Sequence, residues 1–258
     1  VYYMNNMFQN ATAFNGDISQ WDTSSVINMS FMFRDAKNFN QNINTKEITA
    51  ENSPTGEAYT AWNVSNVGTM GYMFQNADNF NQPLGNWDVS SVTDMNTMFG
   101  GADVFNQDLN NWDTSAVTTM RQMFYNTVAF DGDISDWDVS KVTDMNWMFR
   151  NTPFNQNIST KLVNEGQSNE YIAWDTSAVT TMSHMFSNAT SFNQPIGNWN
   201  TSSVTDMSYM FLKAYQFNQN ISTKLVNEGT PNEYIAWDTS NVTNMIEMLR
   251  MITFINVG

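Results

Sequence analysis

Tryptophan recurs along this chain at regular intervals, and the repeat that it marks constrains the fold more than any other feature. The intervals between successive members are 41, 25, 25, 25, 37, 25 and 38 residues. The members are Trp21, Trp62, Trp87, Trp112, Trp137, Trp174, Trp199 and Trp237. Because one unit of roughly 20 to 50 residues cannot bury an apolar face alone, such units fold by stacking on their neighbours. The chain is therefore predicted to form a single repeat domain.

Each unit carries the same apolar residues at the same distances from its tryptophan. Valine follows after 5 residues, methionine after 8 and again after 11, and phenylalanine after 12, with Leu249 in its place in the last unit. The residues from Val1 onward fit the same frame without their tryptophan, which makes nine units. All but one of the 19 methionines, Met251, belong to this pattern. The methionine content therefore reflects the repeat.

The spacing within one unit predicts a short helix followed by a turn and a short strand. In the unit that begins at Trp87, the apolar residues from Val92 to Ala102 fall three, three, one and three positions apart, as on one face of a helix. The predicted fold is an α/β solenoid, a right-handed leucine-rich-repeat-like stack of about nine coils with one short strand and one short helix each. The predicted structural core of this unit comprises Trp87, Val92, Met95, Met98, Phe99, Phe105, Asn106 and Trp112.

Three intervals are longer than the rest, and each extra segment is predicted to be a β-hairpin that projects from the stack. Segments 159–173 and 222–236 are near copies, and segment 44–61 shares their Tyr-x-Ala-Trp ending. Apolar runs on either side of a turn that contains glycine are typical of hairpins. Two interpretations stay open: the hairpins shield the edge of the stack, or they recognise a ligand.

The predicted unit boundaries follow from the tryptophan positions. Val1 falls in the middle of a unit, which predicts a fragment or a processed chain, and Leu249 to Gly258 lose the motif, which predicts a cap or a truncation. The units of the single domain are 1–20, 21–61, 62–86, 87–111, 112–136, 137–173, 174–198, 199–236 and 237–258.

Composition argues against several classes of function. Lys and Arg number 10 against 25 Asp and Glu, and this net charge of −15 argues against binding to nucleic acid or, through basic residues, to an anionic membrane. No apolar run is long enough to span a membrane. The absence of cysteine excludes disulfides, thiolate metal sites and a cysteine nucleophile. Because His184 is the one histidine and no phosphate-binding loop is present, the sequence predicts neither an enzyme nor an organic cofactor.

An acidic residue follows the tryptophan in six of the units. Stacking would place these like charges about 5 Å apart, where they repel one another. Either each aspartate accepts hydrogen bonds within its own Asp-x-Ser turn, which also explains asparagine in the same slot of two units, or neighbouring carboxylates hold calcium. The candidate calcium ligands are Asp22, Asp88, Asp113, Asp138, Asp175 and Asp238.

Four aromatic residues share a variable slot ten residues after the tryptophan, off the apolar stripe. Such residues either anchor a protein partner or a sugar, or they fill gaps between neighbouring helices. The Glu-Gly turns of the two near-copy hairpins supply two further candidates. The full set of predicted ligand-binding residues is Phe31, Tyr72, Trp147, Tyr209, Glu165 and Glu228.

The motif Trp-Asp-(Thr/Val)-Ser-x-Val-Thr-x-Met-x-x-Met-Phe-x-x-Ala-x-x-Phe-Asn-Gln, seen from Trp87 to Gln107, covers essentially the whole chain in register. It resembles the BspA-like bacterial surface-protein repeat, a family also found in mycoplasma lipoproteins and related to leucine-rich repeats. The resemblance implies a leucine-rich-repeat-like solenoid on the outside of a cell, often associated with adhesion. It specifies a scaffold and no particular ligand.

Together these observations predict an extracellular, non-enzymatic surface protein that serves as a repeat scaffold for adhesion or ligand recognition. Its expected partner is a protein or a glycan at a cell surface, with calcium as the one candidate ion. The alternative is a self-assembling structural protein that forms filaments or a surface layer through stacking of copies. Neither nucleic acid nor a membrane span is expected.

Overall fold

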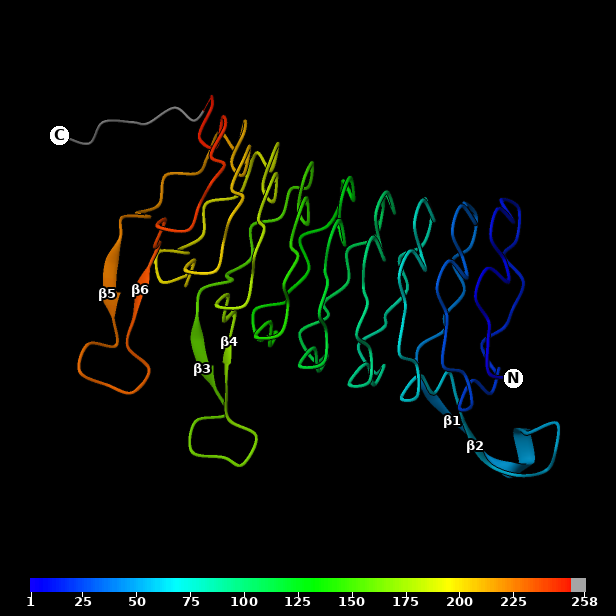
Figure 1. Ribbon diagram of the computed structural model, residues 1–258. Helices are drawn as coiled ribbons and strands as arrows, with labels where there is room; N and C mark the ends of the chain where they lie inside the picture. The colour runs from blue at the N-terminus through cyan, green and yellow to red at the C-terminus, as the bar shows by residue number, and fades with distance from the viewer. Residues whose placement is uncertain (252–258) are drawn as a thin grey trace.

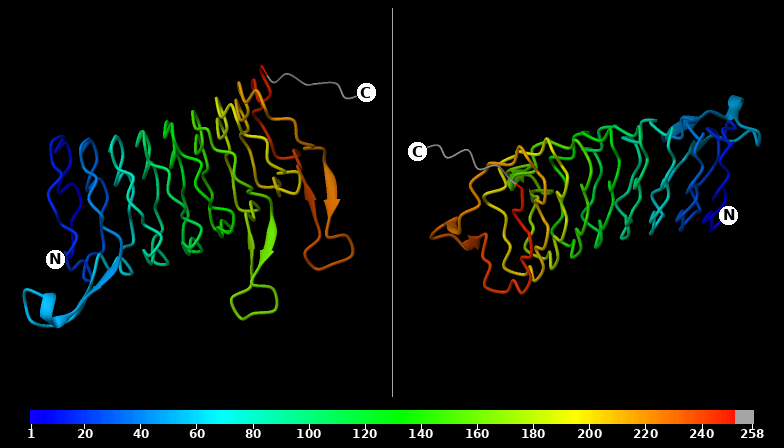
Figure 2. Two further views of the ribbon diagram at one scale, coloured as in Figure 1. Left: turned by 180° about the vertical axis from the view of Figure 1, so that it is seen from behind. Right: turned by 90° about the horizontal axis from the view of Figure 1, so that it is seen from above.

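The structure is a computed structural model that describes residues 1–251, and it shows a stack of repeat units lying side by side along one axis (Figures 1 and 2). Single residues of consecutive units form isolated parallel β-bridges, so hydrogen bonds run along the stack. Nine residues, one from each unit, take part in this ladder: Tyr3, Asn28, Thr69, Asp94, Thr119, Asp144, Thr181, Asp206 and Asn244.

The helix predicted for each unit does not form. Within residues 1–251 the only helix is the three-residue 3-10 helix η1 (Ala50–Asn52), and the strands are confined to three two-stranded sheets. The prediction of an α/β solenoid of the leucine-rich-repeat type, with a strand and a helix in every coil, is therefore wrong. Of the predicted last unit, residues 252–258 lie outside the described part of the chain.

Consecutive tight turns explain the spacing that suggested a helix. The backbone N–H of Met73 donates to the carbonyl of Met70 at 3.1 Å, and the N–H of Ala77 donates to the carbonyl of Phe74 at 3.0 Å. These hydrogen bonds join residues three apart, whereas those of an α-helix join residues four apart. A series of such turns also places apolar side chains at every third or fourth position, so the apolar pattern is the same.

The N–H groups between these turns bond to the next unit. Tyr72 donates to the carbonyl of Asn96, and Phe74 donates to that of Met98, both at 2.8 Å. Tyr72 has a φ of 62°, a left-handed conformation that interrupts any right-handed helix. The same slot is left-handed in the other units that carry it: Asn6, Phe31, Thr97, Gln122, Trp147, His184, Tyr209 and Glu247.

The recurring apolar residues form columns through the centre of the stack. The indole N–H of Trp137 donates to the carbonyl of Leu109 at 2.9 Å, and every recurring tryptophan from Trp62 to Trp237 makes the corresponding bond. Phenylalanine rings stack between units, with the centroids of Phe99 and Phe124 5.7 Å apart. Of the predicted core set, the buried members are Trp87, Val92, Met95, Met98, Phe99, Phe105 and Trp112.

Asn106, the remaining member of that set, is exposed and belongs to a ladder of amides along the surface of the stack. The Oδ1 atom of Asn81 accepts from the N–H of Asn106 at 2.9 Å, and Oδ1 of Asn106 accepts from the N–H of Asp131 at 2.8 Å. The same bond recurs between the other units from Asn15 to Asn218. Each bond satisfies a backbone donor that the turn leaves unpaired.

Three antiparallel pairs occupy the segments that the sequence predicted to be hairpins. All three project from the same edge of the stack, one near its N-terminal end and two near its C-terminal end (Figure 1). They are β1 (Lys46–Ile48) with β2 (Tyr59–Ala61), β3 (Lys161–Val163) with β4 (Tyr171–Ala173), and β5 (Lys224–Val226) with β6 (Tyr234–Ala236).

Candidate ligand-binding groove

A groove of about 580 Å³ lies between the second and third hairpins. One wall is the β3–β4 hairpin, the other is the β5–β6 hairpin, and the floor comes from the stack between them, including Thr176 and Asn200. Both hairpins leave the stack from the same edge (Figure 1). The volume falls in the range of roughly 300 to 1,000 Å³ that small-molecule sites occupy.

The two hairpins contribute different cross-strand pairs of apolar or aromatic side chains to the groove. In the β3–β4 hairpin, the cross-strand pair of Leu162 and Ile172 lines it. In the β5–β6 hairpin, the neighbouring pair in the register, Val226 and Tyr234, lines it from the opposite side. The two near-copy hairpins therefore present opposite faces to the groove.

Each of these wall residues has a chemically identical counterpart outside the groove. Leu225 and Ile235 correspond to Leu162 and Ile172, do not line the groove, and are exposed at 46% and 47%. The hairpins thus provide internal controls, because the same substitution can be made in the same local sequence inside and outside the site.

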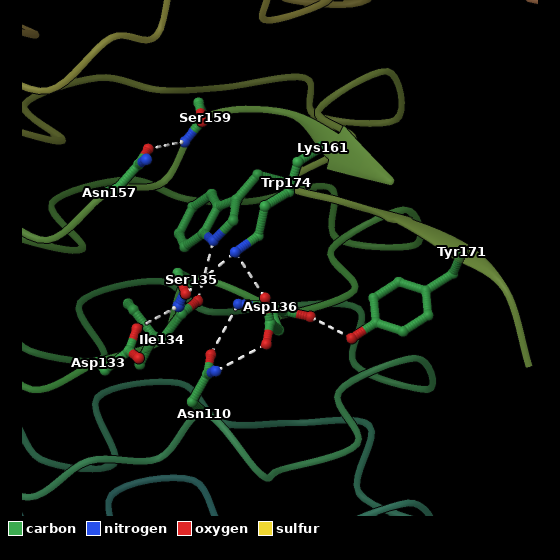
Figure 3. Close-up of polar contacts among 10 residues, drawn as sticks. All are labelled: Asn110, Asp133, Ile134, Ser135, Asp136, Asn157, Ser159, Lys161, Tyr171 and Trp174. Carbon is green, nitrogen blue, oxygen red and sulfur yellow. Dashed lines mark hydrogen bonds and ion pairs between the residues drawn. The ribbon is translucent and has the colours of Figure 1, made fainter. Parts of the chain in front are cut away.

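Three side chains hold the β3–β4 hairpin against the preceding unit (Figure 3). The hydroxyl of Tyr171 donates to the carbonyl of Asp136. The Nζ atom of Lys161 lies 2.6 Å from Oδ1 of Asp136 and 3.2 Å from Oγ of Ser135. The indole of Trp174, the residue directly after β4, donates to a backbone carbonyl of the same preceding unit at 3.0 Å. This wall is therefore fixed at its base.

These contacts also set the charge of the groups involved. The hydrogen bond from Lys161 holds the pKa of Asp136 below its usual value. Burial raises the pKa of the hydroxyls of Tyr171 and Tyr234 above their usual value, and nearby carboxylates add to the effect. At neutral pH Asp136 is therefore ionised and both tyrosines are neutral.

Two carboxylates reach the groove, and the backbone fixes one oxygen of each. The N–H of Ser177 donates to Oδ1 of Asp175 at 3.0 Å. The N–H of Gly229 donates to Oε2 of Glu233 at 2.7 Å. Oδ2 of Asp175 and Oε1 of Glu233 accept no hydrogen bond from any residue in the part of the chain that the structure describes. They are therefore available as acceptors for a ligand.

The predicted calcium ligands form local turns. Oδ1 of Asp88 accepts from the N–H of Ser90 at 3.1 Å and from its hydroxyl at 2.6 Å. Within residues 1–251, no three acidic or histidine side chains are grouped so that they could hold a metal ion. Calcium binding stays a prediction from the sequence alone. The same bond to the N–H two residues later is made by Asp22, Asp113, Asp138, Asp175, Asp238, Asn63 and Asn200.

The predicted aromatic ligand-binding residues contact aromatic neighbours in two separate groups. The centroids of Phe31 and Tyr72 lie 4.7 Å apart with nearly parallel rings. His184 lies between Trp147 and Tyr209, at 4.9 and 4.5 Å. Each of the four rings therefore has an aromatic neighbour, and their role in ligand binding stays a prediction.

Glu165 and Glu228, the predicted ligand-binding residues of the hairpin turns, are exposed and do not line the groove. The sequence reasoning missed groove residues such as Asn198, Asn200 and Asn232. A signal for them was present, since two near-copy hairpins are separated by a single short unit. Hairpins that leave one edge of a stack so close together must face each other.

A second cavity, of about 610 Å³, lies beside the loop between β1 and β2 and is lined by residues that include Met4, Trp21 and Tyr59. Of the three hairpins in residues 1–251, one alone, β1–β2, lines this cavity, together with residues of the first and second units. The groove between β3–β4 and β5–β6 is bounded by a hairpin on each of two sides, and we therefore take it as the candidate site.

Residues 1–251 contain no helix with the length and apolar character that crossing a membrane requires. The model of a family described as Mycoplasma protein of unknown function, DUF285, matches residues 1–53, 45–162 and 159–257. No curated protein and no solved structure matches the chain significantly. The family match confirms the mycoplasma part of the resemblance, whereas the relation to BspA-like and leucine-rich repeats stays a prediction.

Proposed function

This chain belongs to the DUF285 family of Mycoplasma proteins of unknown function, and we propose that it is an extracellular, non-enzymatic surface protein that holds a ligand in its interhairpin groove. One observation carries the proposal. Units from Trp87 to Trp137 stack without any insertion, so the hairpins that wall the groove are not needed to build the stack. Added segments on a rigid scaffold are where binding residues concentrate.

The architecture supports recognition in preference to catalysis. The groove is lined by two hairpins whose bases are fixed. Apolar side chains lie on both walls, and polar side chains lie on the floor. The proposed extracellular location rests on the sequence resemblance. A repeat stack also suits display at a surface, because each unit contacts only its neighbours and extends the scaffold without changing the site.

The test compares Leu162→Asp with Leu225→Asp in the full chain. Leu162 lines the groove, Leu225 does not, and the two are exposed at 47% and 46%, so the two substitutions impose similar costs on folding. Each protein is applied to an immobilised panel of purified extracellular-matrix proteins and oligosaccharides. We expect at least one ligand whose binding weakens about tenfold or more in L162D, since a carboxylate would be placed in an apolar contact, and is unchanged in L225D.

Equal loss in both variants, or no bound ligand at all, would overturn the assignment of the groove. Mass spectrometry of the recovered ligand should show it chemically unchanged, and a cleaved or modified ligand would overturn the non-enzymatic part. Antibodies against the chain should label intact, unpermeabilised cells of the native organism. Labelling only after permeabilisation would contradict the surface location.

A second candidate function, self-assembly, is favoured by one observation. The aliphatic pair of Leu225 and Ile235 faces away from the groove and is about half exposed, although its counterpart in β3–β4 faces another hairpin. Sedimentation of the full chain and of L225D separates the candidates. Large assemblies of the full chain that are absent from L225D would support self-assembly. Monomers in both samples would leave ligand recognition as the function.

A further inference from the structure

We propose that the groove binds an uncharged oligosaccharide. This inference rests on the proposed function and names the ligand class of the same site. More than half of the residues that line the groove carry uncharged amide or hydroxyl groups, among them Asn198, Asn200 and Asn232. A sugar presents many hydroxyl groups that both donate and accept, and amide side chains can satisfy both roles. This composition therefore matches a sugar more closely than it matches an apolar ligand.

The fixed acceptors strengthen the match. Asp175 and Glu233 each have one carboxylate oxygen held by a backbone N–H, which orients the other oxygen without using it. Asn200 is fixed in the same way, because its Oδ1 accepts from the N–H and the hydroxyl of Ser202, which leaves its amide N–H groups as donors. Oriented acceptors and donors on the floor and on one wall allow hydrogen bonds without a further loss of side-chain freedom.

The walls provide the apolar contact that the carbon-bound hydrogens of a sugar ring require. Leu162 and Ile172 lie on one side, and Val226 lies on the other. Tyr234 is held in place by the bond from its hydroxyl to the carbonyl of Asn198, so its ring forms a fixed part of the second wall. A flat ligand with polar edges and less polar faces fits between two such walls.

The charges of the groove exclude anions. Lys161 is its one cation within the described residues, and the ammonium group is already paired with Asp136 at 2.6 Å. Asp175 and Glu233 add two negative charges, and the whole chain carries a net charge of −15. Sialylated or sulfated sugars would be repelled by this field. The ligand class is therefore neutral.

The experiment compares the full chain with Asn232→Ala and Asn169→Ala. Asn232 lines the groove, whereas Asn169 holds the same position in the other hairpin, outside the groove. Both positions share one loop geometry, since the carbonyls of Asn232 and Asn169 accept from the side chains of Asn227 and Asn164. The probes are arrays of neutral oligosaccharides of hexoses and N-acetylhexosamines, sialylated and sulfated oligosaccharides, and alternating Val–Lys and Val–Glu hexapeptides.

We expect binding to a neutral oligosaccharide that weakens about fivefold in N232A, the loss of one uncharged hydrogen bond, and stays unchanged in N169A. Binding that depends on Asn232 but selects charged sugars or peptides would overturn the neutral-sugar inference and leave the proposed function standing. Neutral-sugar binding that is equal in both variants would show that the sugar lies outside the groove. A chain that binds none of the probes, yet shows a groove-dependent partner in the L162D comparison, would also overturn the inference.

Discussion

The β3–β4 and β5–β6 hairpins share almost the same sequence and the same pairing register, yet they differ in what surrounds them. Lys161 of the first pairs with Asp136 of the preceding unit. Lys224, its counterpart, meets a unit in which Asn198 occupies the slot of Asp136, and no ion pair of Lys224 exists among residues 1–251. The repeat units beneath an insertion, as much as the insertion itself, therefore determine which contacts the hairpin makes.

The largest expected difference concerns the tryptophan that follows each hairpin. Trp174 stacks on Trp199, with centroids 6.0 Å apart, and also contacts Phe149. Trp237 contacts Phe211 of the unit before it, and no tryptophan follows it in the stack. Trp174→Ala should therefore lower the free energy of unfolding by about 4 kcal/mol, and Trp237→Ala by roughly 1 kcal/mol less.

Urea denaturation followed by circular dichroism measures both variants against the unchanged chain. Each indole also donates to a backbone carbonyl, so this part of the loss is common to the two variants and cancels in the comparison. A loss in W237A that equals or exceeds that in W174A would show that contacts with the following unit contribute nothing to stability.

The stacking of units and the positions of the hairpins could be predicted, because both follow from residues that recur at fixed distances. The conformation within a unit could not. Val92, Met95 and Met98 have the same spacing on a helix as in consecutive tight turns. The left-handed residue that distinguishes the turns stands at the slot of Thr97 and is filled by residues other than glycine in every unit, so no glycine marks it.

The groove depends on the relative placement of two hairpins, which no single repeat contains. Leu162 and Leu225 have the same neighbours in sequence, yet only Leu162 lines the groove. The two hairpins lie opposite each other because a single unit separates them. This number of units could be counted from the sequence once the stacking geometry was known. The aromatic and acidic candidates were prominent because they recur, whereas this candidate site lies where the repeat is interrupted.

The tyrosines test whether the two hairpins are braced equally. The hydroxyl of Tyr171 donates to the carbonyl of Asp136, and that of Tyr234 donates to the carbonyl of Asn198. Tyr171→Phe and Tyr234→Phe should each lower the free energy of unfolding by about 1 kcal/mol at neutral pH. A clear difference between the two variants would show that the bases of the hairpins are not equivalent.

The stability that Tyr171 and Tyr234 contribute should also depend on pH in the alkaline range. Because burial raises the pKa of both hydroxyls in the folded state, their contribution is complete below the unfolded value of about 10 and is lost as the pH rises through the folded value. Unfolding measured at neutral pH and at about pH 11 should therefore show a smaller deficit of Y171F and Y234F at the higher pH. A deficit that is constant with pH would contradict a raised pKa.

The smallest effect should distinguish the hairpins most cleanly. Lys161→Met removes the ion pair with Asp136, which is partly exposed and therefore contributes only about 0.5 kcal/mol, whereas Lys224→Met removes no pair. The sharper measurement is the pKa of the Asp136 carboxyl by NMR, which should rise toward its usual value in K161M and stay in place in K224M. Because the folded pKa is lowered, the contribution of the pair is present above about pH 4 and disappears as the pH falls through the folded value. The stabilities of K161M and the unchanged chain should therefore converge in acid, and a shift of Asp136 in K224M of the same size would remove the distinction between the two hairpins.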